Sequence, residues 1–116
     1  MDVPIEIKNI MGPKETIEMF VDAEAHPEIT VDTVTITSER IILKRQQAGT
    51  GTSDLTLIGF SDITAVGLEK GFMRSILRLR VKSNGGSVEA IRMPSKLADQ
   101  AAVIVKQKVG GLVSPF

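Results

Sequence analysis

The chain has 116 residues, 42% of them hydrophobic and 24% charged, with a formal net charge of zero. This length and composition predict one globular domain with its own core. The absence of cysteine excludes disulfides, thiolate metal sites and cysteine nucleophiles. No basic and apolar leader opens the sequence, and no apolar run approaches the ~20 residues of a membrane helix, so we expect a cytoplasmic protein.

The charges are distributed unevenly along the chain. Residues 1–69 hold five Lys or Arg against twelve Asp or Glu, a balance of −7, whereas residues 70–116 hold nine against two, a balance of +7. Either the two halves neutralise each other in the fold, or the second half presents a surface that attracts anions.

The first half of the chain predicts mainly strands. Residues 1–13 are a lead-in segment without a clear assignment, because Pro4 and the Gly12-Pro13 pair interrupt its alternating apolar residues. Residues 15–23 fit either a helix or a strand, and we predict a strand because sheet-like segments follow. Further strands are predicted at residues 29–37, 40–45 and 55–60, with a loop at 26–28, a tight turn at 38–39 and a polar loop at 46–54.

The strand predicted at residues 29–37 has two different faces. Val34 and Ile36 share the apolar face, and the other face carries Thr33, Thr35 and Thr37.

The second half carries the clearest alternation. A strand at residues 63–69 is followed by one at 75–82, which has an apolar face and a cationic face. The apolar face consists of Leu77, Leu79 and Val81, and the cationic face of Arg78, Arg80 and Lys82. The sequence SNGG at residues 83–86 is the strongest hairpin signal, and it leads into a last strand at 87–93.

The hydrophobic period changes after Pro94. Ser95 is expected to cap a helix that ends before Gly110-Gly111, with Lys106 and Lys108 suiting its negative end. Its apolar stripe is predicted to contain Leu97, Ala98, Ala101, Ile104, Val105 and Val109.

This order of elements, seven antiparallel strands and a C-terminal helix, resembles the pleckstrin-homology-like (PH-like) barrel. TITSERIIL at residues 35–43 is similar to the Thr-x-x-Arg-aliphatic hairpin of bacterial and archaeal PH-like domains. GFSDITAVGLEKG at 59–71 is similar to the next passage of the same domains. The resemblance implies an α+β fold, a single PH-like domain over residues 1–116, and a helix at 95–109 that caps one end of the barrel. It also implies a mostly non-enzymatic family, often tied to membrane-associated or oligomeric assemblies.

The resemblance does not carry phosphoinositide binding with it. PH domains proper hold phosphoinositides with basic residues around the first loop, whereas residues 22–32 of this chain contain Asp22, Glu24, Glu28 and Asp32. Four carboxylates would repel an inositol phosphate.

The segment between the strands at 63–69 and 75–82 is the first candidate site. It places Phe72 and Met73 between Lys70 and Arg74. The two apolar side chains either enter a membrane or partner while the cations meet anionic groups, or fold back beneath the helix as rim packing.

The cationic strand face is the second candidate. Arg78, Arg80 and Lys82, joined by Arg92 from the neighbouring strand, either bind an anionic ligand or only keep the sheet soluble. Nucleic acid is not expected, because no aromatic platform accompanies these cations.

Other motifs carry no chemistry. AGTGTS at residues 48–53 lacks the lysine of a phosphate loop, and the single histidine, His26, has no partner for a metal site or a nucleophile. The acidic cluster at 22–32 lacks the spacing of an EF-hand. We therefore expect no enzyme, no metal and no cofactor.

Two hypotheses about function remain open. The first is a non-enzymatic module that binds protein partners, with self-association through open strand edges. The alternative is peripheral attachment to an anionic membrane through residues 70–74.

Overall fold

The structure, a computed structural model, describes residues 3–23, 31–46, 53–110 and 114–115. Most of these residues lie in strands and helices. The elements in chain order are α1 (Ile5–Ile10), β1 (Ile17–Asp22), β2 (Val31–Thr37), β3 (Arg40–Gln46), β4 (Ser53–Gly59), the 3₁₀ helix η1 (Phe60–Asp62), β5 (Ile63–Glu69), β6 (Arg74–Val81), α2 (Ser83–Gly86), β7 (Val88–Pro94), α3 (Ser95–Val109) and β8 (Ser114–Pro115).

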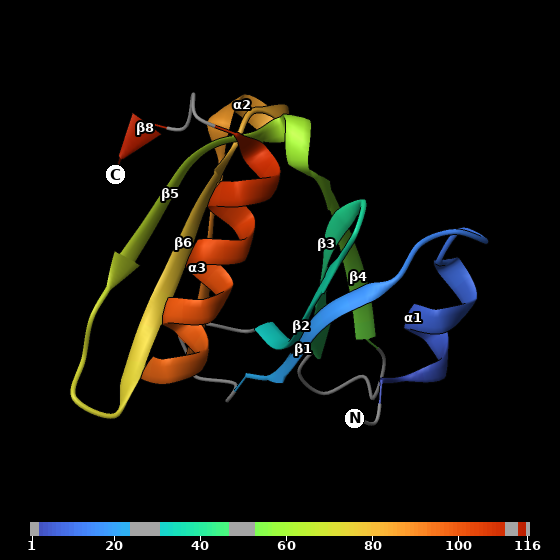
Figure 1. Ribbon diagram of the computed structural model, residues 1–116, viewed down its shortest axis with the longest axis horizontal. Coiled ribbons are helices and arrows are strands. Elements are labelled where there is room, and N and C mark those ends of the chain that lie inside the picture. The colour runs from blue at the N-terminus through green and yellow to red at the C-terminus, as the bar shows by residue number, and fades with distance from the viewer. Residues whose placement is uncertain (1–2, 24–30, 47–52, 111–113, 116) are drawn as a thin grey trace.

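The strands form two four-stranded sheets (Figure 1). The first has the order β1-β2-β3-β4 and the second the order β7-β6-β5-β8, and β1 to β7 pair with their neighbours antiparallel. The chain crosses from one sheet to the other at η1. This arrangement confirms the predicted α+β fold of seven antiparallel strands followed by a helix.

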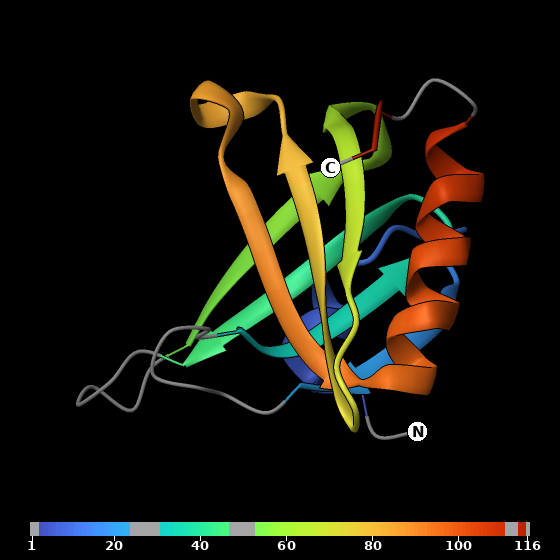
Figure 2. The same cartoon turned by 90° about the vertical axis from the view of Figure 1, so that its left-hand side faces the viewer.

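The main core is shared by both sheets and α3. Figure 2 shows α3 running beside the strands of the second sheet, and its apolar stripe packs inward as predicted. The inward residues of β6, Leu77 and Leu79, are fully buried, so the predicted alternation of this strand is confirmed. An ion pair between Lys108 of α3 and Glu18 of β1 joins the helix to the first sheet.

The Thr-x-x-Arg pattern lies at the turn between β2 and β3 and surrounds a buried carboxylate. The Thr37 hydroxyl donates to Glu15 Oε2 over 2.5 Å and accepts bonds from the backbone N–H groups of Glu39 and Arg40. Arg40 Nε lies 3.1 Å from the same Glu15 oxygen, and the Gly12 N–H donates to Oε1. Burial raises the pKa of Glu15, but the bonds from Thr37, Gly12 and Arg40 outweigh it, so this pKa is lowered.

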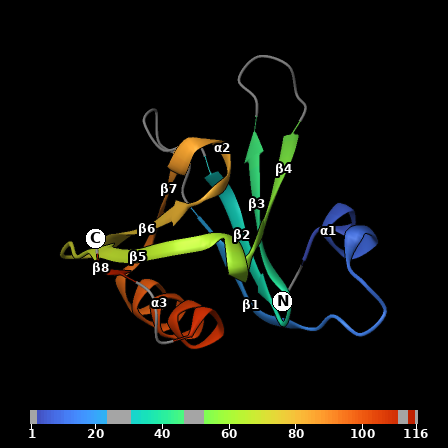
Figure 3. The ribbon, with the colours of Figure 1, turned by 90° about the horizontal axis from the view of Figure 1, so that it is seen from above.

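The lead-in segment contains a helix that the sequence did not predict. From above, α1 lies on one side of the first sheet, while α3 and the second sheet lie on the other (Figure 3). Pro4 stands before the first helical residue, a position where its missing N–H costs nothing. Ile7 of α1 is fully buried, and a second small core forms beneath the helix.

This helix also changes the meaning of the threonine face of β2. Thr33, Thr35 and Thr37 do share a face, but all three are buried, because the lead-in segment covers that side of the sheet. Alternation along one strand defines two faces and cannot tell whether a distant segment covers the polar one.

Two local predictions were wrong in detail. The SNGG segment forms one turn of helix, α2, in place of a tight hairpin turn, with Gly86 at φ +83°. Ser95 opens α3, but its side chain makes no capping bond. Its hydroxyl instead bonds to the segment between β5 and β6.

Several predicted features lie outside the described residues. These are His26 and its loop, Glu24, Glu28, residues 47–52 of the predicted polar loop, and Gly111. The predicted loop at 46–54 was too long, because Gln46 belongs to β3 and Ser53 and Asp54 belong to β4.

Candidate contact surface

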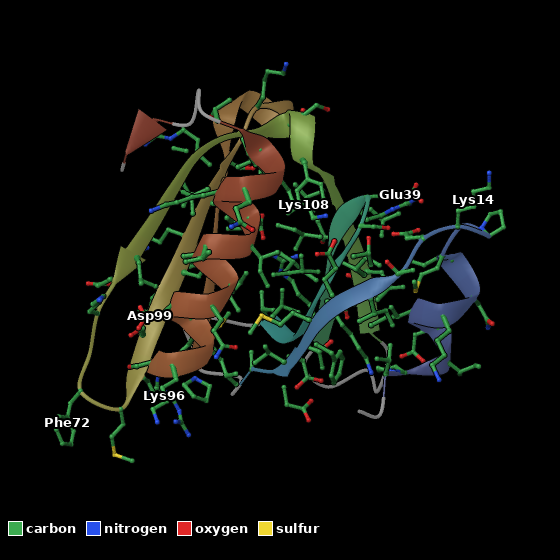
Figure 4. All side chains as sticks on the ribbon, in the orientation of Figure 1. Lys14, Glu39, Phe72, Lys96, Asp99 and Lys108 are labelled. Carbon is green, nitrogen blue, oxygen red and sulfur yellow. The ribbon has the colours of Figure 1, made fainter. Side chains whose placement is uncertain are left out.

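The hairpin tip between β5 and β6 projects two large apolar side chains into solvent. Phe72 is 99% exposed and Met73 67% exposed. In Figure 4, Phe72 points away from the body of the protein, at the end where α3 begins. Of the two arrangements that the sequence left open, the structure has the projecting one: neither side chain packs beneath α3.

A ring of hydrogen bonds holds the backbone of this tip against α3. The Gly71 N–H points to Ser75 Oγ at 3.4 Å, the hydroxyls of Ser75 and Ser95 lie 2.9 Å apart, and the Ser95 hydroxyl donates to the Gly71 carbonyl over 3.2 Å. In addition, the Ser95 N–H donates to the Met73 carbonyl over 3.1 Å. With Ser75 donating to Ser95, each hydroxyl donates once, and the ring closes.

The turn itself requires glycine at position 71. A Cβ atom on Gly71 would lie 2.2 Å from the Arg74 carbonyl oxygen, far closer than two such atoms can approach. The backbone therefore folds tightly on itself beneath Phe72 and Met73. The hydroxyls of Ser75 and Ser95 bond to each other and to the backbone of the tip, whereas the side chains of Phe72 and Met73 face solvent.

Three basic residues lie at the same end of the molecule as the two apolar side chains. Lys70 precedes the turn and Arg74 follows it, and Lys96 in the first turn of α3 comes to the same end of the molecule (Figure 4). Lys70 Nζ lies 3.6 Å from Asp99 Oδ1, and both side chains are more than half exposed. Such an exposed ion pair contributes little in water, so the Lys70 ammonium can exchange Asp99 for an anionic binding partner. Together, the tip surface is formed by Lys70, Phe72, Met73, Arg74 and Lys96.

Lys96 is a member of the tip surface that sequence reasoning missed. Its proximity depends on the bond from the Ser95 N–H to Met73, which joins residues more than twenty positions apart. The only signal in the sequence was the basic residue directly after the expected start of the helix.

The predicted cationic face is present, but its residues differ in how close they lie to the tip. The pairing of β6 with β7 places Arg74, Arg78, Arg80 and Arg92 on one side of the second sheet. Arg92 pairs with Ile76, two residues along β6 from Arg74, and therefore lies next to the tip. Arg78 is engaged by Glu69, whose Oε2 accepts a bond over 2.8 Å.

Lys82 does not belong with the tip. It follows the far end of β6, eight residues beyond Arg74. At ~3.3 Å per strand residue, the two lie roughly 25 Å apart. The sequence-predicted residues therefore form a cluster at the tip, with Arg92 beside it, and a cationic strip that leads away from it.

A hollow lies beside the tip, between β5 and α3. Its volume is about 620 Å³, and it is lined by Val66, Gly67, Leu68, Lys70, Asp99, Ala102, Val103 and Lys106. Val103 is 54% exposed. The C-terminal β8 pairs in parallel with β5 at Ala65 and Val66, next to this hollow.

Within the described ranges, no helix combines the length and apolar character needed to cross a membrane. The same part of the chain contains no group of three or more His, Asp or Glu side chains placed to hold a metal ion.

Comparison with known proteins supports the fold. No family model matches the sequence, and no curated protein matches it. Among solved structures, the pleckstrin homology domain from Shewanella amazonensis SB2B is similar, with a TM-score of 0.68, 18% identity, and coverage of 92% of this chain and 95% of that one. The hSac2 domain of the human phosphoinositide phosphatase Sac2 is also similar, with a TM-score of 0.65, 11% identity, and coverage of 97% and 83%. The chain therefore has a PH-like fold, as its sequence patterns predicted.

Proposed function

We propose that this protein is a non-enzymatic binding module that attaches to anionic membrane surfaces through the tip surface. The observation that carries the proposal is the full exposure of Phe72, with Met73 beside it, on a backbone fixed by the Ser75–Ser95 ring. Exposed apolar side chains on a projecting tip are typical of interaction sites, where binding removes them from water. A fixed backbone adds to this, because little further order has to be imposed when the tip binds.

The shape and charge of the tip favour a membrane over a protein pocket. Phe72 projects from a narrow turn (Figure 4), Met73 beside it is exposed, and both would enter the acyl boundary. Lys70, Arg74 and Lys96 would then lie at the level of the headgroups. An apolar point within a ring of cations is the arrangement by which peripheral proteins combine insertion with attraction to anionic lipids.

The energies of these contacts predict reversible attachment. Burying a Phe or Met side chain contributes about 1.5–3 kcal/mol, and each cation near an anionic surface contributes about 1 kcal/mol. Full contributions from two apolar residues and three cations sum to roughly 6–9 kcal/mol. This is an upper bound, because Arg74 also interacts within the protein and Lys70 pairs with Asp99. The apparent dissociation constant is therefore micromolar or weaker. Neither the apolar pair nor the cations would be sufficient alone.

A protein partner is the second candidate, and it is favoured by a different observation. Since β8 already pairs with the edge of β5, that edge accepts an extended segment, and the hollow between β5 and α3 lies directly beside it. An extended segment of a partner protein, or of a second copy, would add as another strand along the rest of β5, beyond the two residues that pair with β8.

Liposome co-sedimentation tests the membrane proposal. We expect the protein to sediment with vesicles of phosphatidylcholine and phosphatidylserine and to stay in the supernatant with phosphatidylcholine alone. Phe72→Asp should reduce binding at least tenfold, because a charged side chain then replaces the inserting ring. The matched control is Val103→Asp, which changes another exposed apolar residue, in the hollow, and should bind as the unmodified protein does.

Two results would contradict the proposal. One is equal binding of Phe72→Asp and the unmodified protein, and the other is no binding to anionic vesicles at all. If, in addition, Val103→Asp alone disrupted an oligomer or a partner complex, the second candidate would replace the first.

A further inference from the structure

Helix α1 covers the outer face of the first sheet (Figure 3), and a small second core lies between them. Val3 and Ile7 are buried against Ile42 of β3. Partly buried residues from three places surround them: Ile17, Phe20 and Leu55. The cover has little apolar contact of its own, because only Val3 and Ile7 from the N-terminal segment are buried in this cluster.

Two buried hydroxyl groups beneath this cover are unsatisfied. The oxygens Thr33 Oγ1 and Thr35 Oγ1 are buried and have no hydrogen-bond partner among the residues that the structure describes. The strand register places Thr35 between Phe20 and Ile42, and therefore within the second core. Thr37, in the same row, differs because its hydroxyl donates to Glu15.

Such hydroxyls weaken the closed arrangement. A buried polar group without a partner shifts a packing equilibrium by about tenfold toward states in which water reaches it. Another contact of α1 is an ion pair between Glu6 and Lys44 at 3.0 Å. The Glu6 side chain is 42% exposed, so water screens this pair and its contribution is modest. A helix of six residues is also not stable by itself in water.

The C-terminal end of the lead-in segment, at Gly12, is held by hydrogen bonds to Glu15. Gly12 donates its N–H to Glu15 Oε1 and accepts a bond from the Glu15 N–H at 3.2 Å. Because Glu15 is also bonded to Thr37 and Arg40, the chain is held at this point independently of α1. The backbone between Met11 and Gly12 can therefore act as a hinge while β1 remains in the sheet.

We propose that α1 is a displaceable cover, which opens as one unit about the Gly12–Glu15 anchor while the main core stays folded. Opening hydrates Thr33 and Thr35. It also exposes Phe20, Ile42 and Leu55 next to Leu57, which is already 49% exposed, and so creates a second apolar face distinct from the tip surface. The inference is independent of the proposed membrane function.

Native-state amide hydrogen exchange on the full chain tests this directly. The N–H groups of Ile7, Lys8 and Met11 are bonded within the cover, whereas Leu77 belongs to the main core. We expect the three cover amides to exchange together and at least a hundredfold faster than Leu77. Exchange of the cover amides at the Leu77 rate would overturn the proposal, since α1 would then open only with the whole protein.

Two substitutions sharpen this test. Ile7→Ala should accelerate exchange of the cover amides at least thirtyfold and leave Leu77 unchanged, and equal acceleration at both places would overturn the proposal. Thr35→Val removes an unsatisfied hydroxyl with almost no change in volume and should lower the open population, and so slow exchange of the cover amides, about tenfold. Thr37→Val is the contrasting variant: its hydroxyl is bonded to Glu15, so its removal should accelerate exchange of the cover amides and not slow it. Faster opening of Thr35→Val would show that its hydroxyl is satisfied in the closed state and would contradict the proposal.

Discussion

The β2–β3 turn and the β5–β6 tip both connect antiparallel strands, but one exposes polar side chains and the other exposes apolar side chains. Each reverses the chain between antiparallel strands, and each is fixed by hydroxyl groups, Thr37 in one and Ser75 with Ser95 in the other. At the β2–β3 turn, the charged side chain of Glu39 is exposed, and the buried group is the carboxylate of Glu15. At the tip, the exposed side chains are Phe72 and Met73.

This difference separates residues that build the fold from residues that the fold presents. A turn of polar residues is sufficient to join two strands, as Ser38 and Glu39 show. The fold therefore does not require apolar side chains at positions 72 and 73. Stability is therefore expected to depend on the β2–β3 turn, and binding on the tip. The substitutions below test that separation.

The largest expected effect on stability comes from Glu15→Ala. It leaves the Thr37 hydroxyl, the Gly12 N–H and the Arg40 guanidinium without their shared acceptor, at a cost of about 3 kcal/mol of unfolding free energy. Urea unfolding measures this loss. Glu39→Ala is the control at the same turn and should change stability by less than about 0.5 kcal/mol. If vesicle binding fell in proportion to stability, the separation of the two turns would be wrong.

Gly71→Ala should have an intermediate effect and act on both properties. The added Cβ forces the backbone apart at the Arg74 carbonyl, which costs about 1–3 kcal/mol and displaces Phe72. At Gly59 the nearest atom to a new Cβ is Ser61 Oγ at 3.9 Å, so Gly59→Ala is a control that the structure accommodates. Urea unfolding and co-sedimentation of both variants provide the comparison. Equal behaviour of the two variants would show that the tip does not have the tight turn described.

The smallest of these effects is the pH dependence that Glu15 brings to folding. Its pKa is lowered in the folded state from the ordinary value of 4.5. The stabilisation is therefore complete above pH 4.5 and is lost as the pH falls through the lower, folded-state pKa. In Glu15→Gln, this part of the acid limb should disappear from a series of urea titrations between pH 6 and pH 2. An unchanged acid limb would mean that Glu15 is not the titrating group.

The regular elements could be predicted because their signals are local. The alternation of Leu77, Leu79 and Val81 with cations, and the 3.6-residue stripe of α3, follow from the geometry of a strand and a helix. The two sequence patterns that suggested the PH-like fold were informative for the same reason. The Thr-x-x-Arg pattern closes a turn, although its acceptor, Glu15, lies 22 residues before Thr37.

The features that could not be predicted depend on contacts between distant segments. The projection of Phe72 depends on the ring that Ser95 closes with Ser75, and the burial of Thr35 depends on α1. The short helix α1 itself was hidden, because Val3, Ile5 and Ile7 alternate like a strand and Pro4 is typical of a break. No local pattern distinguishes an exposed Phe at a turn from one packed beneath a helix.

The most direct test of the central claim is the depth of the tip in a membrane. The chain has no cysteine, so Met73→Cys and Val103→Cys each give a single labelling site for a polarity-sensitive fluorophore. With vesicles containing phosphatidylserine, the label at position 73 should shift to shorter wavelength and become shielded from an aqueous quencher, while the label at 103 should not change. A label at 73 that stays as accessible with vesicles as without them would contradict the account.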